Sequence, residues 1–458
     1  MITRRALSGS VLFAAASAER ARSAQAQSPT PAGVRRTEVE ALRRFAESTH
    51  PRGCEAAADS DWRSRWDALA AEADTLSDGG YFVHTRAALG WFKDGHTTPL
   101  PFEFIGGVPA QLADGAFGLE LPFRVRVFHD GAYVVAAKDE AAVLVGARIT
   151  RIGAMETGAL IRAWARNWPG TESWAHRWSG RAFAPAFLEA LGAVRDASEA
   201  IVVQVERNQR RLQARLRPRS AAGEGLQDLV RQKAAQEAWS ETTGGGNYVR
   251  PLPDRRALYV SIDAMEDVEG KTFEQLTRDC FAAMEDVRAG RMVIDLRRNG
   301  GGDNFKQEGL RKRILRSSFN RPGGLYVLTS PITFSAAQNC ATRLERDSFA
   351  LFVGEPTGGT PNQYGDAQTF VGEATGIVSI VSTLAWFDSY PQDNRALMMP
   401  DIFAPMLFAD WAAGRDNALE AALTGTIENP ADELDRRSIF FFERPSQLQE
   451  WRPFWRAT

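Results

Sequence analysis

The chain has 458 residues, of which 44% are hydrophobic and 24% charged. This length exceeds what a single hydrophobic core supports, so we expect several domains in a globular chain rather than a disordered one. The net charge of -2 gives no basis for nucleic-acid binding. Three cysteines form neither a disulfide framework nor a metal-ligand pattern. We therefore expect no metal, no cofactor and no nucleic-acid partner.

The N-terminus has the pattern of an export signal. Arg4 and Arg5 precede a mildly apolar run over residues 6–18, and small-residue cleavage sites follow, the second ending at Ala26. The stretch TRRALS resembles a twin-arginine signal. We expect residues 1–26 to be a signal peptide and the protein to be periplasmic or secreted; a disordered N-terminus is the alternative. No later apolar run approaches the roughly 18 residues of a membrane span.

The spacing of apolar residues divides the part of the chain that follows the N-terminus into two regions. Residues 36–95 space apolar side chains at three and four, which predicts helices that end at KDGHTTP. Residues 117–219 contain two hairpin patterns, FRVRVFHDGAYVVAA and AIVVQVERNQRRLQARLRP, with the short strand ARITRI and the helix TGALIRAWARNW between them. These elements predict a small α+β module. A helix and a glycine-rich linker are expected over residues 220–250.

The remainder predicts alternating strands and helices. Short apolar runs without alternation suit strands buried on both faces of a layered sheet. The runs are ALYVSI, RMVIDL, LYVLT, ALFVG and GIVSIVS. Helical stretches such as FEQLTRDCFAAMEDVRA separate several of them. The expected class is therefore a multidomain α/β protein.

Three polar loops follow three of these strands: RRNGGGDN, SPITFSAA and EPTGGTPNQYGD. If the strands are parallel, the loops meet at one sheet edge, where α/β proteins bind ligands. The triple glycine leaves backbone N–H groups uncovered, so it can bind an anion or a developing oxyanion, although a tight turn is the simpler reading. Ser335 stands at the corner between strand and helix. A helix N-cap is its ordinary role.

Together, the segments VIDLRRNGGGDN, TSPITFSAAQNCATRL and FVGEPTGGTPN resemble the tail-specific (C-terminal processing) serine peptidase family, which includes the catalytic core of tricorn protease. The resemblance implies a ClpP/crotonase-like α/β core with an N-terminal helical region and a PDZ-like α+β domain. In the latter, FGLELPF takes the place of the carboxylate-binding loop. The expected divisions are a signal peptide (1–26), the helical region (27–115), the PDZ-like domain (116–222), the catalytic core (223–430) and a C-terminal extension (431–458).

The same resemblance implies that Ser335 is a nucleophile. It also implies an oxyanion hole formed by the Ala336 N–H and one glycine N–H of residues 300–302, for which Gly301 is favoured. Much of the family uses a lysine base in the third loop, but Thr360 occupies that position here. No lysine follows Ser335 in the sequence, so a Ser–Lys dyad in the usual order is impossible.

A histidine base remains, as in the tricorn-like branch. His96 lies in DGHTT, a motif that this branch carries at its catalytic histidine. We expect structural roles for the other four histidines, at positions 50, 84, 129 and 176. Asp393 is the candidate acid that orients His96, with Asp94 and Glu355 as alternatives, whereas Asp401 is expected to close a structural turn.

Two functions fit this pattern. The first is a serine endopeptidase that cleaves peptides, unfolded proteins or protein C-termini through an acyl-enzyme on Ser335 with a His base. The second is a catalytically decayed module on the same fold that binds a small apolar ligand or a peptide. The intact Ser335, triple glycine and His96 favour the enzyme. The sequence leaves the substrate and the oligomeric state open.

Overall fold

The computed structural model describes residues 33–166, 168–220, 246–268, 270–286, 290–425 and 453–456. The expected signal peptide, residues 221–245 of the expected helix and linker, and most of the 431–458 extension lie outside these residues. The chain divides into two compact units. Among the described residues, unit 1 contains those within 246–363 and 386–425, and unit 2 contains those within 33–220, 364–385 and 453–456. The expectation of a multidomain α/β protein is confirmed.

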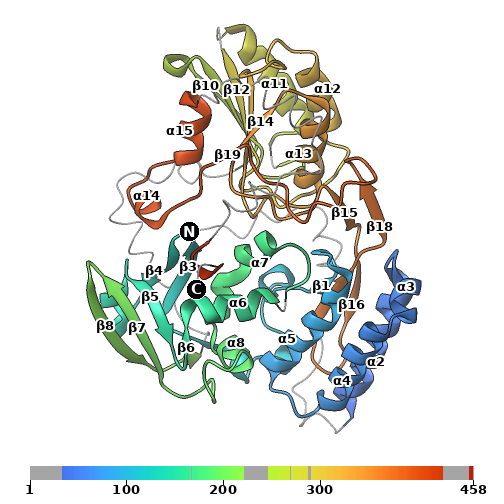
Figure 1. Cartoon of the computed structure of the whole chain (residues 1–458), viewed down its shortest axis with the longest axis vertical. Helices are drawn as coiled ribbons and strands as arrows, with labels where there is room; N and C mark the ends of the chain where they lie inside the picture. The colour runs from blue at the N-terminus through green and yellow to red at the C-terminus, as the bar shows by residue number, and fades with distance from the viewer. Residues whose placement is uncertain are drawn as a thin grey trace. The chain divides into compact units, whose positions relative to one another are not determined.

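Unit 1 is built on a six-stranded sheet in the order β10-β11-β12-β13-β14-β19 (Figure 1). Its strands are β10 (Tyr248–Leu252), β11 (Ala257–Ser261), β12 (Arg291–Asp295), β13 (Leu325–Thr329), β14 (Leu351–Gly354) and β19 (Ile402–Phe403). β11 to β14 and β19 run parallel, and β10 pairs antiparallel with β11. Four of the five predicted strands therefore lie side by side, with their carboxyl ends at one edge.

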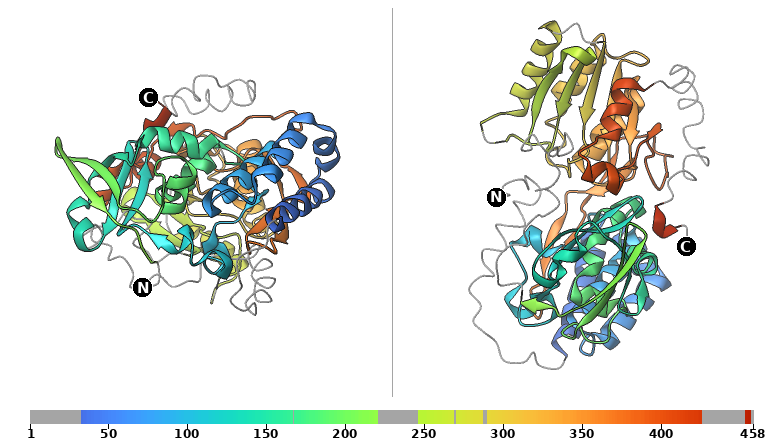
Figure 2. Two further views of the ribbon diagram at one scale, coloured as in Figure 1. Left: turned by 90° about the horizontal axis from the view of Figure 1, so that it is seen from below. Right: turned by 90° about the vertical axis from the view of Figure 1, so that its left-hand side faces the viewer.

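Both faces of this sheet are covered, which explains why its strands lack alternation. On one face, side chains of Leu258, Ile294 and Val327 pack against α11, α12 and α13. On the other face, Tyr259, Val293 and Leu328 pack against α15 (Figure 2, right). The helices of unit 1 are α11 (Phe273–Asp286), α12 (Glu308–Leu315), α13 (Ala336–Asp347), α14 (Phe408–Ala412) and α15 (Asn417–Thr424).

The prediction for GIVSIVS was wrong about its sheet. This run forms β17 (Val378–Val381), which belongs to unit 2 and pairs antiparallel with β1 (Thr98–Pro99) and β16 (Gln368–Val371). An apolar run bounded by turn residues looks the same in either setting, because local sequence does not record the partner strand. Two further strands, β15 (Asn362–Gly365) and β18 (Leu384–Phe387), pair where the chain passes from one unit to the other.

The helical region predicted at 36–95 is confirmed in unit 2. It contains α2 (Val34–Thr49), α3 (Gly53–Ala58), α4 (Ser60–Glu72) and α5 (Asp78–Leu89). Trp62 and Trp66 of α4 are almost fully buried. The Asp59 carboxylate caps α4 by accepting hydrogen bonds from the backbone N–H groups of residues 61 and 62.

The predicted α+β module is also present, with a sheet in the order β3-β4-β5-β7-β8 and β6 paired to β5. Both predicted hairpins are confirmed. The strands are β2 (Leu119–Glu120), β3 (Phe123–Phe128), β4 (Gly131–Ala137), β5 (Arg148–Ile152), β6 (Met155–Glu156), β7 (Ile201–Arg207), β8 (Arg210–Leu216) and β9 (Arg219–Ser220). The helices are α6 (Thr157–Arg166), α7 (Glu172–Trp178) and α8 (Pro185–Ala190). The PDZ-like identity of this module stays a prediction.

Within the described ranges, no helix has the length and apolar character needed to cross a bilayer. Cys54, Cys280 and Cys340 are free thiols, so the one bridge that three cysteines allow is not formed.

Candidate active site

The three predicted loops meet at the carboxyl edge of the unit 1 sheet, as the parallel order of β12, β13 and β14 requires. The Thr333 hydroxyl donates to the Leu296 carbonyl (2.9 Å), and the Phe334 N–H donates to the Asn299 carbonyl (3.2 Å). From the third loop, the Gly358 N–H donates to the Thr333 carbonyl (2.9 Å). Hydrogen bonds therefore fix the Ser335 loop between its two neighbours.

A buried ion cluster anchors the first of these loops. The Arg297 guanidinium donates to Asp295 Oδ2 (2.6 Å) and to Asp416 Oδ1 (2.6 Å). The Tyr259 hydroxyl donates to Asp295 Oδ2 (2.6 Å). Burial alone would raise the pKa of Asp295, but the Arg297 charge and these hydrogen bonds hold that pKa below its ordinary value. The charges stay paired, and the backbone entering the triple glycine is held in place.

Ser335 is not an ordinary helix N-cap. It precedes α13 with φ 54° and ψ -127°, and its side chain makes no capping hydrogen bond. A residue with a Cβ held at positive φ costs of order 1–3 kcal/mol and persists only where the surrounding structure enforces it. The Ser335 side chain therefore does not stabilise the start of this helix. The hydroxyl therefore projects from the strand-to-helix corner, which is how a serine nucleophile is presented.

Gly301 packs directly on this corner. It has φ +125°, and a Cβ at this position would lie 2.5 Å from Ser335 Cβ and 3.0 Å from Ser335 Oγ. Only glycine allows this approach. By contrast, a Cβ on Gly300 would meet nothing within 4 Å. The two neighbouring glycines therefore differ sharply in how they contact the candidate nucleophile.

Backbone donors surround the corner, although not all are available. The Gly301 N–H, the favoured oxyanion donor, donates to Asn299 Oδ1 (2.9 Å). Asn299 is fully buried and also donates to the Ile262 carbonyl (2.9 Å). Among the described residues, the Ala336 N–H has no hydrogen-bond acceptor. It lies at the N-terminus of a 12-residue helix, where partial positive charge favours an oxyanion.

Replacing Gly301 with alanine is expected to lower kcat/KM by at least about 10², because the added Cβ must displace the Ser335 side chain. The matched Gly300→Ala variant adds the same methyl group in open space and should keep at least about half of the wild-type rate. Steady-state kinetics and thermal unfolding of both proteins would test this. Equal activities of the two variants would contradict the role given to the Gly301 contact.

The third loop offers no basic side chain. The Thr360 hydroxyl donates to the Asn362 carbonyl (2.5 Å) and thus serves the loop itself. Lys306, downstream of the triple glycine, is paired with Asp267 at 2.7 Å, and this hydrogen bond raises the lysine pKa. A general base needs a lowered lysine pKa. Lys306 is therefore a poor substitute for the missing lysine.

Unit 2 contains a separate polar centre, the Asp94 cluster, which comprises Asp94, His50, His96, Thr97 and Ser382. Asp94 is buried and accepts hydrogen bonds from the hydroxyls of Thr97 and Ser382, both at 2.6 Å. The backbone N–H of His96 donates to Asp94 Oδ1 (3.0 Å), and the ring nitrogen Nδ1 of His96 lies 3.7 Å from the same oxygen. Asp94, one of the two alternative acids, is thus the carboxylate next to His96.

His50 completes this cluster from the end of α2. Its Nδ1 accepts a hydrogen bond from the backbone N–H of Arg52 (3.0 Å). In the neutral imidazole, the ring proton therefore lies on Nε2. This nitrogen is 3.6 Å from Asp94 Oδ2. The ring stacks on Phe92 with 3.8 Å between centroids. Burial alone would raise the pKa of Asp94, but the neighbouring His50 and His96 imidazoles and the hydrogen bond from the Ser382 hydroxyl hold it far below its ordinary value. Asp94 is therefore an anion beside two imidazoles.

Asp393, the favoured acid, lies in unit 1 within a different network. It accepts hydrogen bonds from the Ser389 hydroxyl (2.6 Å) and from Arg395 Nε (2.9 Å) and Nη2 (2.8 Å). Arg395 continues to Glu345 at 2.7 Å. These contacts are those of a carboxylate that holds a loop in place. The turn expected at Asp401 stays a prediction, because the hydrogen bonds that Asp401 exchanges with the backbone of Phe352, 49 positions away, link β14 to the residue before β19.

Sequence reasoning did not predict two members of the Asp94 cluster as candidate site residues. Ser382 lies in the GIVSIVS run and carries no motif. His50 was assigned to the structural histidines, although its place at the predicted end of the first helix, with the helix stop at KDGHTT downstream, was the available signal. His176, another of the histidines expected to be structural, lies in α7.

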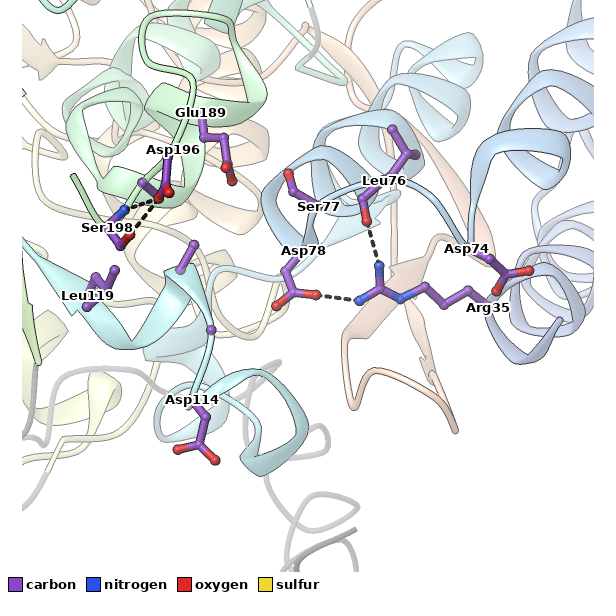
Figure 3. A pocket seen from close by; sticks show the side chains of 13 residues that line it. Arg35, Asp74, Leu76, Ser77, Asp78, Asp114, Leu119, Glu189, Asp196 and Ser198 are labelled. Atoms are coloured by element: carbon purple, nitrogen blue, oxygen red, sulfur yellow. Dashed lines mark hydrogen bonds and ion pairs between the residues drawn. The ribbon is translucent and has the colours of Figure 1, made fainter. Parts of the chain in front are cut away.

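The large cavity in unit 2, of about 830 Å³, contains none of the predicted site residues. Five of the thirteen residues that line it are acidic, and one is an arginine. Arg35 pairs with Asp78 and donates to the Leu76 carbonyl (2.9 Å), while Asp196 accepts hydrogen bonds from Ser198 (Figure 3). Among the described residues, no group of three or more His, Cys, Asp or Glu side chains is arranged to hold a metal ion.

No family model matches this sequence, and no curated protein matches it. Solved structures do match. Mature CPAF in complex with lactacystin is 12% identical with a TM-score of 0.57, covering 88% of this chain and 97% of that chain. Mature CPAF gives 12% identity and a TM-score of 0.56 over 87% and 98% of the two chains. Tricorn protease is 11% identical with a TM-score of 0.38, covering 87% of this chain and 37% of that one. These structures belong to S41 tail-specific proteases, and this chain shares the fold of CPAF.

Proposed function

We propose that this protein is a serine-type peptidase whose nucleophile is Ser335. The observation that carries the proposal is the backbone of Ser335, which is strained at positive φ at the start of α13 with no capping hydrogen bond. A purely structural serine would relax into the cap geometry. The likeness to CPAF in fold supports the same activity class.

In the proposed reaction, Ser335 Oγ attacks the carbonyl carbon of a peptide bond, and His96 accepts the hydroxyl proton. The oxyanion of the tetrahedral intermediate is stabilised by the Ala336 N–H and by an N–H of the glycine loop. His96 then donates its proton to the leaving amine, and water hydrolyses the acyl-enzyme with His96 again as base. The Gly301 N–H is occupied by Asn299, so Gly300 or Gly302 is the better second donor and Gly301 provides the close approach.

We assign the orienting role to Asp94. An anion held beside His96 fixes the ring and stabilises the imidazolium that forms during the reaction. Asp94 has the position and the charge for this role, and its hydroxyl partners Thr97 and Ser382 keep it in place. Asp393 was the acid predicted from the sequence, but its carboxylate accepts a hydrogen bond from Arg395.

A fluorophosphonate probe tests the proposal directly, because it forms a covalent bond only with an activated serine. We expect the wild-type chain to be labelled at Ser335, as identified by peptide mass spectrometry, and to hydrolyse an unstructured peptide. A decayed binding module would leave the probe unreacted. Peptides and unfolded protein segments, including protein C-termini, are the proposed substrates.

We further propose that the chain is exported after removal of a signal peptide. Mass spectrometry of the protein from its native host should find a mature N-terminus at Gln27, following Ala26. Recovery of residues 1–18 on a mature cytoplasmic product would contradict export.

A further inference from the structure

Residues 453–456 lie in unit 2, far along the chain from the rest of that unit. The short turn η9 (Phe454–Arg456) packs against α6. Trp455 is only 2% exposed, although it enters from a separate segment. A tryptophan side chain buries about 150–250 Å², so this one residue supplies a large apolar contact.

The turn is bound through its backbone as well as its side chain. The Trp455 carbonyl accepts from Arg162 Nη1 of α6 (2.7 Å), and the Phe454 N–H donates to the His129 carbonyl in the β3–β4 turn (3.0 Å). The indole N–H donates to His176 Nδ1 of α7 (3.3 Å). We call this surface, formed by Arg162, His129 and His176, the Trp455 site.

His176 is suited to recognise an indole. Its ring stacks on Trp455 with centroids 6.1 Å apart and an interplanar angle of 30°. Burial, followed by the nearby His129 and Arg177, lowers the pKa of His176 to about 4. The ring is therefore neutral at pH 7 and its Nδ1 can accept the indole hydrogen bond. Phenylalanine or leucine would leave this buried nitrogen without its donor, which favours tryptophan.

The site continues beyond Trp455. A cavity of about 430 Å³ lies beside the indole, lined by Arg162, Ala165, Arg166, Glu172 and Trp455. There is consequently room for residues that flank the tryptophan of a longer peptide. Backbone hydrogen bonds combined with one side-chain pocket are the means by which domains bind peptide segments.

We propose that the Trp455 site is a second, non-catalytic peptide-binding site, specific for a segment that carries tryptophan, and that residues 453–456 occupy it as a tethered ligand. A tethered ligand acts at an effective concentration of order millimolar, so a free peptide competes poorly with it. Loss or displacement of the turn opens the site to a tryptophan-bearing segment of another polypeptide. This inference does not depend on Ser335.

Fluorescence anisotropy with a labelled peptide of residues 453–458, PFWRAT, tests the site in the full-length chain. We expect Trp455→Ala protein to bind the peptide at least tenfold more tightly than wild type, since its own turn no longer fills the pocket. A peptide carrying alanine in place of the tryptophan should bind neither protein. In the Trp455→Ala background, His176→Phe should weaken peptide binding at least tenfold.

A chain that ends at residue 452 provides a second variant, because it removes the tethered ligand entirely. It should bind PFWRAT as tightly as the Trp455→Ala protein. Thermal unfolding would verify that each variant is folded. If neither folded variant binds PFWRAT, or if the alanine peptide binds equally well, the turn is a packing element only and the proposal fails. Fluorophosphonate labelling plays no part in either outcome, so the proposed peptidase activity is judged separately.

Discussion

Ser335→Ala protein is expected to show no hydrolysis above background and no fluorophosphonate labelling, while its melting temperature stays within a few degrees of wild type. The hydroxyl makes no capping hydrogen bond, so its loss removes chemistry without removing a structural contact. Loss of a serine nucleophile costs about 10⁶ in kcat in a well-studied serine protease. Peptide hydrolysis, probe labelling and thermal unfolding on the same preparation would measure all three effects.

Ser335→Gly supplies the matched control. Glycine tolerates the positive φ that strains serine or alanine, so we expect this variant to be equally inactive but at least as stable as Ser335→Ala. A markedly less stable glycine variant would show that the backbone at this corner is not strained. Retained peptidase activity in either variant would remove Ser335 as the nucleophile.

The sequence was a good guide to the parallel sheet of unit 1 because local and tertiary signals agree there. Runs such as RMVIDL and LYVLT are apolar on both faces, and they form β12 and β13 between α11–α13 and α15. The same signal failed for GIVSIVS. This run forms β17, which pairs antiparallel with β1 and β16. Its local sequence does not distinguish an antiparallel strand from a parallel one.

The candidate site was predictable to the extent that its residues lie in contiguous loops. Ser335 and the triple glycine stand where strand order and turn chemistry place them. The positive φ of Ser335 and its close contact with Gly301 depend on the folded structure, and the spacing of residues in the sequence does not predict them. Likewise, the hydrogen bond between Asp94 and Ser382 joins residues 288 positions apart, so the place of Ser382 in the Asp94 cluster could not be read from a motif.

Our proposal of Asp94 over Asp393 as the acid for His96 rests on what each carboxylate already binds. Asp393 is neutralised by Arg395, which also pairs with Glu345. The main groups that lower the pKa of Asp94 are His50, His96 and the Ser382 hydroxyl. A negative charge left beside an imidazole stabilises imidazolium, whereas a charge neutralised by arginine does so only weakly.

Asp94→Asn is therefore expected to lower kcat/KM by about 10³–10⁴, the loss seen when the acid of a serine protease triad becomes an amide. The matched Asp393→Asn change should cost less than tenfold in kcat/KM. It should instead lower the melting temperature, because the change leaves Arg395 without part of its charge partner. His96→Ala should approach the loss seen for Ser335→Ala, since residues that act as one catalytic unit are not additive.

The pH dependence of kcat/KM separates these roles from simple misfolding. An ordinary imidazole titrates near pH 6.5, so a rate that depends on a neutral histidine base rises with pH across that value. Removing the Asp94 anion withdraws what favours the protonated ring, and the rise in the Asp94→Asn profile should move to lower pH; Asp393→Asn should leave the profile in place. Because a change in stability alone does not shift a kinetic pKa, an unshifted Asp94→Asn profile together with a shifted Asp393→Asn profile would return the orienting role to Asp393.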